Sequence, residues 1–500
     1  MGVIATGLVA AGSNIPSLWG DEAASVMSAE RPLATLWPVL ARVDAVHGVY
    51  YVLLHFWIDV FGSTAFSVRF PSALAIGFAT AGMVLLAHRL GGLRLGVVAG
   101  LVFMIIPRTT YMGAEARSYA LSAAVAVWLT LLVVVLIHRG YSAQGRRARV
   151  LTLAGWVLYS LGLIAGISIF LYLAFLAVAH VAIVLLLRST RATMLAWAIS
   201  GATAAGLILP FVLDVISQRQ QVAFLATRPR VGVWQILVEQ WMGNVGFAVI
   251  AWTIIVAGIT WAFHAARLAR IPPGAPAGPS DSTSAGIGHR FPPALFVGLS
   301  WLIVPQALML LLTLVTPLYA LRYMSFVTPA LALLMSFAIV AVTRMRHREW
   351  IALALMLALV GASLMTYLGQ RQPFAKDNGT DFAQVAATIG EQANRGDAII
   401  FDPTIRPSQR PRLSLRLYPE DFTLVTDVLL SRAYDTRSGL WDTQHSITDS
   451  ASYFDGYERV WVVEARYSST WALTELESQG FTVVQVIPEN HCVIYELERL

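Results

Sequence analysis

The chain has 500 residues, of which 57% are hydrophobic and only 13% are charged, and its mean hydropathy is +0.65. A soluble domain carries about 25% charged residues, so this composition excludes an ordinary soluble protein and indicates an integral membrane protein. The net charge of +6 comes from arginines in short segments between apolar runs, which fits the positive-inside rule and does not call for nucleic acid. A single cysteine, Cys492, excludes an intrachain disulfide.

Apolar runs of roughly 17–25 residues, the length that crosses a bilayer, recur as far as residue 369. Eleven runs are predicted to span the membrane: 2–18, 67–87, 95–112, 118–137, 151–166, 168–187, 192–213, 246–264, 293–315, 324–343 and 350–369. The first is short and begins almost at Met1, so it is either a minimal span or the remainder of a longer one that starts upstream.

The orientation follows from the arginines, which cluster beside the ends of these runs, as in 138–149. Placing the N-terminus in the cytoplasm puts the clusters inside, as the positive-inside rule requires. The chain is then expected in the plasma membrane with its C-terminus outside, together with the segments 19–66, 214–245 and 316–323. The Pro-, Gly- and Ser-rich stretch 271–288 is expected to be a disordered cytoplasmic linker.

The first outer loop, 19–66, begins with two adjacent acids in Trp19-Gly20-Asp21-Glu22-Ala23. Charged groups at a membrane boundary are costly, so Asp21 and Glu22 are candidates for function, the alternative being that they cap a loop in water. The stretches 36–43 and 50–60 are amphipathic and rich in aromatic residues, which is typical of helices that lie in the interface. Because these stretches lie close to the two acids in the sequence, they predict a cavity at the outer face that the amphipathic helices cover.

Composition changes after about residue 371, where charges and prolines become frequent. Strands are predicted at 397–401, 459–463, 481–487 and 492–495, and helices at 380–394 and 469–479. This alternation indicates an α/β domain at 372–500, outside the membrane, that follows a transmembrane domain at 1–371. No Gly-rich phosphate loop follows a strand, which argues against nucleotide binding and favours a lid or scaffold.

Further polar residues are expected at the outer face. Glu115 and Arg117 stand where one span ends and the next begins, either as a local ion pair or with Glu115 facing Asp21 across a cavity. Arg322 could bind an anionic head group with both branches of its guanidinium, or extend to lipid phosphate. His47 has no second histidine at ligand spacing, which favours a polar cavity residue over a metal ligand.

These residues carry a resemblance to a known superfamily. Trp19–Ala23 and Asp44–Tyr51 resemble the first outer loop of GT-C glycosyltransferases, in particular bacterial members of the protein O-mannosyltransferase and aminoarabinose-transferase branch. The resemblance is good over residues 15–125, loose over the remaining spans and positional for the C-terminal domain. The resemblance continues through Leu54–Trp57, Phe61-Gly62, Arg69–Ser72, Pro107, Glu115–Tyr119 and Arg322-Tyr323. Many members have His-Pro-Pro-x-Tyr-Tyr where this chain has His47-Gly48-Val49-Tyr50, so the shape of this loop is expected to differ.

The resemblance implies a polytopic α-helical GT-C fold with about eleven transmembrane helices, a polyprenyl-phosphate sugar as donor, and inversion at the anomeric carbon. It maps the catalytic base onto Asp21, with Glu22 and Glu115 positioning the acceptor or the base. Arg322 would hold the lipid phosphate, with Arg117 and Arg228 as weaker candidates. The expected substrate-binding set is Asp44, His47, Tyr50, Arg117, Tyr119, Arg228, Arg322 and Tyr323.

Several alternatives stay open at this point. Mannose is the first choice of sugar and arabinofuranose or another pentose the second, while the envelope acceptor is a protein, a lipid or a glycan. No metal site is assigned, although the carboxylates could hold a divalent ion. A lipid-linked glycan transporter would more often show intramembrane charges and repeated halves, and no convincing repeat is present. A non-catalytic sensor or scaffold that binds through the C-terminal domain is the third alternative.

Overall fold

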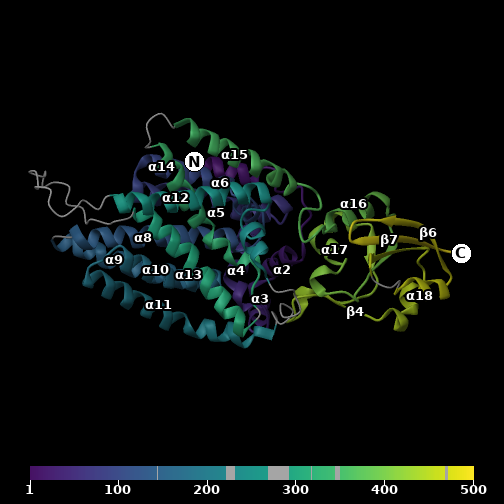
Figure 1. Ribbon diagram of the computed structural model, residues 1–500. Helices are drawn as coiled ribbons and strands as arrows, with labels where there is room; N and C mark the ends of the chain where they lie inside the picture. Colours follow the sequence, from purple (N-terminus) through teal and green to yellow (C-terminus); the bar gives the residue numbers. More distant parts are fainter. Residues whose placement is uncertain (143–144, 221–230, 269–291, 317, 344–348, 468–470) are drawn as a thin grey trace, which may run out of the picture. The chain divides into compact units, whose positions relative to one another are not determined.

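The computed structural model describes residues 1–142, 145–220, 231–268, 292–316, 318–343, 349–467 and 471–500 (Figure 1). The predicted linker at 271–288 and Arg228 lie outside these described residues. The chain divides into two compact units. The first comprises residues 1–11, 72–114 and 118–367, and the second comprises 12–71, 115–117 and 368–500.

Helices build the first unit (Figure 1). Its elements are α1 (Gly2–Ala10), most of α5 (Ala65–Gly91), α6 (Leu93–Ile105), α7 (Pro107–Gly113), α8 (Tyr119–Ser142), α9 (Arg146–Ile169), η2 (Leu171–Leu173), α10 (Ala174–Leu186), α11 (Arg191–Ser217), η4 (Gln235–Glu239), α12 (Val245–Leu268), α13 (Pro293–Val315), η5 (Leu321–Val327), α14 (Thr328–Thr343) and most of α15 (Glu349–Gly369). Helix α9 packs between α8 and α11, and α14 packs against α6, α12 and α13.

Eight helices in the described part of the chain are long and apolar enough to cross a membrane: α5, α8, α9, α11, α12, α13, η5 with α14, and α15. Helices α6 and α7 give a ninth if they are one span bent by 64°. The bend falls at Ile106, whose extended backbone is what the residue before a proline favours, because the ring of Pro107 disfavours the helical conformation there. These helices make the chain a multi-pass membrane protein.

The two remaining predicted runs form shorter helices. The run 2–18 is helical only over α1, nine residues long, and Gly12 with φ +68° follows its end. The run 168–187 becomes η2 and α10, because Phe170 is extended and separates them from α9. The hydropathy pattern predicted the positions of both segments, but it could not predict the residues at which their helices end.

The second unit includes the loop 19–66, which is largely helical: α2 (Gly20–Ala29), α3 (Leu33–Leu40), η1 (Ala45–His47) and α4 (Gly48–Phe61). The two amphipathic stretches are therefore helices, as predicted. Helix α2 packs against α4 and against α17 (Leu413–Leu417). One apolar core joins them, formed by residues such as Met27, Tyr51, Leu54 and Leu417.

The sheet of the second unit has the strand order β2-β1-β5-β7-β6. Its strands are β1 (Asp397–Phe401), β2 (Val425–Asp427), β5 (Arg459–Ala465), β6 (Phe481–Pro488) and β7 (Cys492–Arg499). Strand β1 is parallel to both neighbours, with Ile399 opposite Trp461, whereas β7 is antiparallel to β5 and β6. The predicted strands are all present, and the α/β class is confirmed.

Both faces of β1 are covered, which explains why all five of its residues are buried. Ile399 and Phe401 pack with helix α16 (Phe382–Gln392), while Ala398 and Ile400 pack toward helix α18 (Leu473–Ser478). The short strands β2, β3 (Leu430–Arg432) and β4 (Thr443–Gln444) escaped prediction, since two or three residues carry no periodicity. Short helical turns connect them: η6 (Pro407–Gln409), η7 (Pro419–Phe422), η8 (Tyr434–Thr436), η9 (Ile447–Asp449) and η10 (Ala451–Phe454).

Candidate functional site

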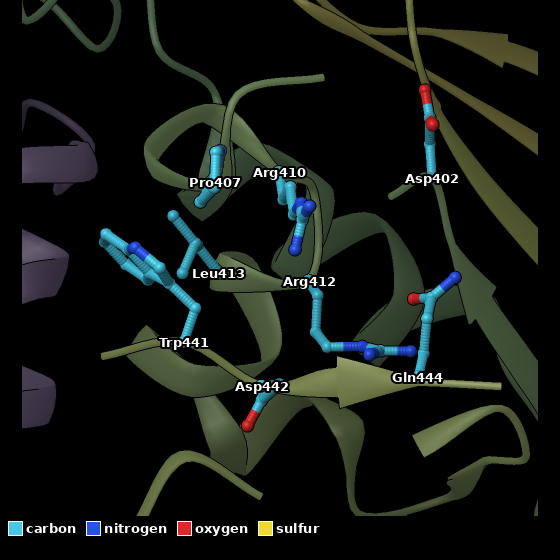
Figure 2. Close-up of a pocket in the computed structure, with 8 residues that line it drawn as sticks. All are labelled: Asp402, Pro407, Arg410, Arg412, Leu413, Trp441, Asp442 and Gln444. Carbon is cyan, nitrogen blue, oxygen red and sulfur yellow. The ribbon is translucent and has the colours of Figure 1, made fainter. Parts of the chain in front are cut away.

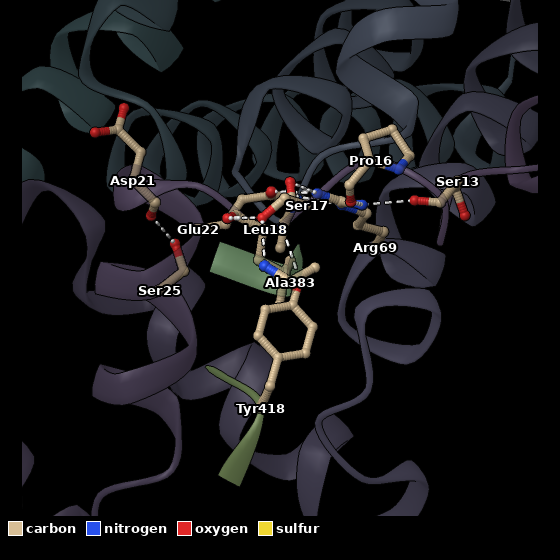
Figure 3. Close-up of polar contacts among 11 residues, drawn as sticks. Ser13, Pro16, Ser17, Leu18, Asp21, Glu22, Ser25, Arg69, Ala383 and Tyr418 are labelled. Atoms are coloured by element: carbon tan, nitrogen blue, oxygen red, sulfur yellow. Dashed lines mark hydrogen bonds and ion pairs between the residues drawn. The ribbon is translucent and has the colours of Figure 1, made fainter. Parts of the chain in front are cut away.

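A buried ion pair between Glu22 and Arg69 anchors the loop 19–66 (Figure 3). The Arg69 Nε and Nη2 groups donate to the two carboxylate oxygens over 2.7 and 2.5 Å. The remaining N–H groups of Arg69 donate to the main-chain carbonyls of Ser13, Pro16 and Ser17. All five donors of this guanidinium are therefore used. Arg69 binds Glu22, which lies 47 positions away in the sequence, and also the segment before α2.

Glu22 stays ionised although its side chain is fully buried. Burial is the largest single effect and raises the pKa of this carboxyl group, while the charge and hydrogen bonds of Arg69 lower it. The charge of Lys376 and the main-chain N–H of Ala116, 2.8 Å from Oε1, act in the same direction. The net result is a pKa below the usual range, so Glu22 acts as a fixed anion and not as a proton carrier.

The neighbouring acid, Asp21, has a different environment. It lies in the first turn of α2, where the helix dipole favours a negative charge, and it is only partly buried. Figure 3 shows its carboxylate pointing away from the Glu22–Arg69 pair, while the Ser25 hydroxyl donates to its main-chain carbonyl over 3.1 Å. Of the two adjacent acids, Glu22 is therefore part of a buried ion pair, whereas the Asp21 carboxylate is half-exposed.

Arg117 lies beside Asp21 in the same unit. Its Nη1 donates to the Asp21 carbonyl and to the Ser25 hydroxyl, both over 3.2 Å, and its Nη2 contacts His47 Nε2 at 2.8 Å. Because a guanidinium only donates, Nε2 of His47 must accept, which makes this imidazole neutral with its proton on Nδ1. The Arg117 guanidinium thereby holds His47 in the loop, because the Nε2 lone pair accepts its hydrogen bond.

Asp44 and the two tyrosines of α4 complete the loop. The Tyr51 hydroxyl donates to Asp44 over 2.9 Å, and Asp44 has φ +59°, a conformation that aspartate tolerates better than most residues. Burial raises the pKa of Asp44, as does the charge of Asp21, and Arg117 only partly offsets this. Tyr50 is buried in the core of the second unit. Asp21, Asp44, His47 and Arg117 are therefore brought together.

Glu115 is buried and forms part of a group of charges that also includes Glu22, Arg69 and Lys376. Lys376, the one lysine in the sequence, is 1% exposed, and its carbonyl accepts hydrogen bonds from the N–H groups of residues 379 and 380. Burial lowers the pKa of Lys376 to about 8, although the charges of Glu115 and Glu22 act to raise it. Sequence reasoning missed this residue, yet a single lysine in an arginine-rich chain was a usable signal.

Three predicted residues belong to the first unit. Arg322 and Tyr323 lie in η5, and the Tyr323 ring stacks on Tyr172 with 4.9 Å between centroids. Tyr119 meets the edge of Phe170, which also contacts Tyr323. Arg322 therefore immediately precedes Tyr323, a member of this aromatic cluster. Across the described ranges, no three His, Cys, Asp or Glu side chains gather as a metal site.

Breaking the buried pair should destabilise the protein strongly. Glu22→Met or Arg69→Met leaves one buried charge without its partner, which costs about 3–5 kcal/mol. The double variant removes both charges and should lose less than the sum of the two single losses. Thermal unfolding of the purified protein in detergent measures this, with the exposed Arg42→Met as control. Additive losses would contradict a coupled pair.

Lys376 should titrate well below an ordinary lysine. With ¹³C-labelled lysine incorporated, its single Cε signal should have a midpoint near pH 8 in the folded protein, against 10.5 for a free side chain. Because the folded pKa is the lower one, the folded state binds fewer protons between these values. The free energy of unfolding should therefore rise with pH across that window, relative to Lys376→Met. A folded-state midpoint near 10.5 would refute the buried cluster.

No protein-family model matches the chain, and no curated protein matches it by sequence. Its structure is similar to that of ArnT from Cupriavidus metallidurans bound to undecaprenyl phosphate, with a TM-score of 0.60, 13% identity, and coverage of 99% of this chain and 96% of that one. It is also similar to the apo oligosaccharyltransferase of Archaeoglobus fulgidus, with a TM-score of 0.53, 11% identity, and coverage of 93% and 69%. The archaeal enzyme AglB from the same organism, in complex with an inhibitory peptide and a dolichol-phosphate, gives a TM-score of 0.51 at 11% identity, with the same coverage. The chain therefore has the GT-C membrane fold.

Proposed function

We propose that the chain is a glycosyltransferase that takes a sugar from a polyprenyl-phosphate donor and transfers it, with inversion, to an acceptor of the cell envelope. The observation that carries this proposal is the similarity to ArnT over 99% of the chain, since that ArnT structure holds undecaprenyl phosphate. The AglB structure holds a dolichol-phosphate, so two neighbours of this fold bind the same class of lipid. Both support a lipid-linked donor here.

The proposed reaction is a direct displacement at the anomeric carbon. The acceptor hydroxyl oxygen forms the new bond, its proton passes to the Asp21 carboxylate, and the bond from the anomeric carbon to the phosphate oxygen breaks. The electron pair leaves on the phosphate, which needs cationic stabilisation. Asp21 suits the base because its carboxylate is half-exposed and turned away from the buried Arg69.

The surrounding groups position this base. Glu22 and Arg69 fix the start of α2, and Glu115 and Lys376 extend the same buried cluster. Arg117 donates to the Asp21 main-chain carbonyl and keeps His47 neutral. These contacts restrict where the Asp21 carboxylate can lie, which is how positioning reduces the barrier to reaction.

Arg322 is the proposed ligand of the lipid phosphate. A guanidinium matches two phosphate oxygens at once, and the aromatic cluster of Tyr323 and Tyr172 beside it suits a sugar or an isoprenoid. Arg117 and Arg228 remain weaker candidates. Mannose is the preferred sugar and a pentose such as arabinofuranose the second choice. The N-terminus is proposed to be cytoplasmic and the α/β domain extracytoplasmic, since lipid-linked donors can present their head groups outside.

Replacing Asp21 by asparagine should remove the base while preserving size and fold. We expect kcat to fall by about 10²–10⁴-fold with little change in donor KM, because general-base catalysis contributes on that order. Transfer from a radiolabelled polyprenyl-phosphate sugar measures it. The exposed Asp59→Asn serves as the matched control. Turnover near that of the wild type would remove Asp21 from this role.

Arg322→Ala should act on the donor instead. Loss of a charge-assisted contact to phosphate costs about 1.5–3 kcal/mol, so donor KM should rise by roughly tenfold or more at constant acceptor. The exposed Arg219→Ala should leave donor KM unchanged. An Arg322→Ala protein with the donor KM and kcat of the wild type would sink the phosphate assignment.

A further inference from the structure

The two units contain buried polar side chains of different kinds. In the second unit buried charges pair with one another, as Arg412 does with Asp427 at 2.9 Å and Asp442 with Arg416 at 2.8 Å. Arg412 and Asp442 line a hollow with room for about one water molecule, and these ion pairs explain its charged walls (Figure 2). The first unit contains networks of uncharged side chains, and one of them includes a residue three positions before Arg322.

Gln240, Gln306 and Tyr319 form this network, which is a closed ring of hydrogen bonds. The Gln240 amide nitrogen donates to Gln306 Oε1 over 2.9 Å, and the Gln306 amide nitrogen donates to the Tyr319 hydroxyl over 2.7 Å. The Tyr319 hydroxyl donates to Gln240 Oε1 and closes the ring. Each side chain therefore donates one hydrogen bond and accepts one, which fixes the orientation of both amides. Gln240 is fully buried, and Tyr319 is 8% exposed.

The ring connects two segments whose helices depart from the regular α-helix. Gln240 directly follows the π-helix η4, and its N–H donates to the Gln235 carbonyl, five residues back, over 2.8 Å. Tyr319 lies two residues before η5, the 3-10 helix that carries Arg322. Helix η5 packs against η4 and against α13, which carries Gln306. Distortions of this kind are frequent at functional sites.

A second contact holds η5 on the other side of Arg322. The buried indole of Trp241 donates from Nε1 to the Met324 carbonyl over 3.3 Å. Arg108 holds this segment in turn, because its main-chain N–H and its Nε donate to the carbonyls of Trp241 and Gln240 over 3.0 and 2.6 Å. Gln240 and Trp241 therefore fix the main chain three residues before Arg322 and two residues after it.

We propose that Gln240, Gln306 and Tyr319 are positioning residues, which hold the main chain of η5 so that the Arg322 guanidinium is preorganised for the lipid phosphate. A guanidinium binds phosphate best in a defined direction, and a guanidinium on a fixed main chain loses less entropy when it binds. The inference rests on the proposed function for the role of Arg322. The ring residues themselves touch neither the phosphate nor the sugar and act through Arg322.

The chemistry of the ring supports positioning over simple packing. Buried hydrogen-bonded groups contribute little net stability compared with apolar side chains of the same shape. A fully satisfied network instead selects a single arrangement, because displacing one member leaves another donor or acceptor buried without a partner. This constraint is useful at the start of η5, since the hydrogen-bond geometry of a 3-10 helix is poorer than that of an α-helix.

Binding of farnesyl phosphate to the full-length protein in detergent tests the proposal. Native mass spectrometry measures the affinity, with farnesol as the same chain without the phosphate. Tyr319→Phe keeps the aromatic ring and removes the hydroxyl that closes the network. It should weaken farnesyl phosphate binding about three- to tenfold, the factor that one hydrogen bond represents, and leave farnesol binding unchanged. Gln240→Leu should act alike, since the main-chain contacts of residue 240 remain.

A double-variant cycle shows whether the ring acts through Arg322. In the Arg322→Ala protein, Tyr319→Phe should change the affinity for farnesyl phosphate by less than about twofold, because no guanidinium is left to position. Tyr159→Phe is the matched control and should bind as the wild type does. The buried Tyr159 hydroxyl also makes two side-chain contacts, with His180 Nδ1 at 2.8 Å and with the Trp197 indole N–H at 3.2 Å. A melting temperature for each variant separates weaker binding from a general loss of stability.

Four results would overturn the proposal: no binding of farnesyl phosphate, unchanged binding in Tyr319→Phe or Arg322→Ala, equal weakening of farnesol, or losses from the two variants that add in full. The transfer assay gives a separate answer, in which Tyr319→Phe should raise donor KM and leave acceptor KM unchanged. Coupled phosphate binding without any transfer would retain the positioning role and reject the proposed function. Transfer without such coupling would reject the positioning role alone.

Discussion

A carboxylate and a guanidinium buried together cost free energy unless each finds all its hydrogen bonds, and the second unit depends on one such pair. Arg69 uses its five donors on Glu22 and on three carbonyls of the segment before α2. Glu22 also accepts a hydrogen bond from the Ala116 N–H, which joins residues 115–117 to the loop 19–66. Three distant parts of the sequence therefore meet at one ion pair, and Asp21 is placed by its neighbour.

Long-range hydrogen bonds also join the C-terminal part of the second unit to its N-terminal part. Arg31 is buried and donates to the carbonyls of Arg437, Gly439 and Leu440, and the Tyr418 hydroxyl accepts from the Leu18 N–H. The α/β domain and the loop 19–66 thus share a core and form one compact body. The C-terminal domain is therefore not a separately folded body, because it forms one unit with the segment that carries the proposed base, Asp21.

Hydropathy and strand patterns allowed much of the fold to be predicted from the sequence, because long spans and buried strands such as β1 carry strong periodic signals. The short polar strands β2 to β4 carry none, and the helix breaks at Gly12 and Phe170 depend on single backbone conformations. The separation of Asp21 from Glu22 could not be predicted, since it requires knowing that Arg69 reaches one acid and not the other. Lys376 was visible as an isolated lysine, but its partners lie hundreds of residues away.

The most direct test of the account uses proteoliposomes that contain the purified chain, a polyprenyl-phosphate sugar labelled in the sugar, and an envelope fraction as acceptor. With the wild-type protein we expect the label to leave the lipid and to appear on the acceptor with inverted anomeric configuration. With the Asp21→Asn protein we expect the label to stay on the lipid. Label that crosses the bilayer while still attached to its lipid, without transfer, would contradict the account and identify a transporter.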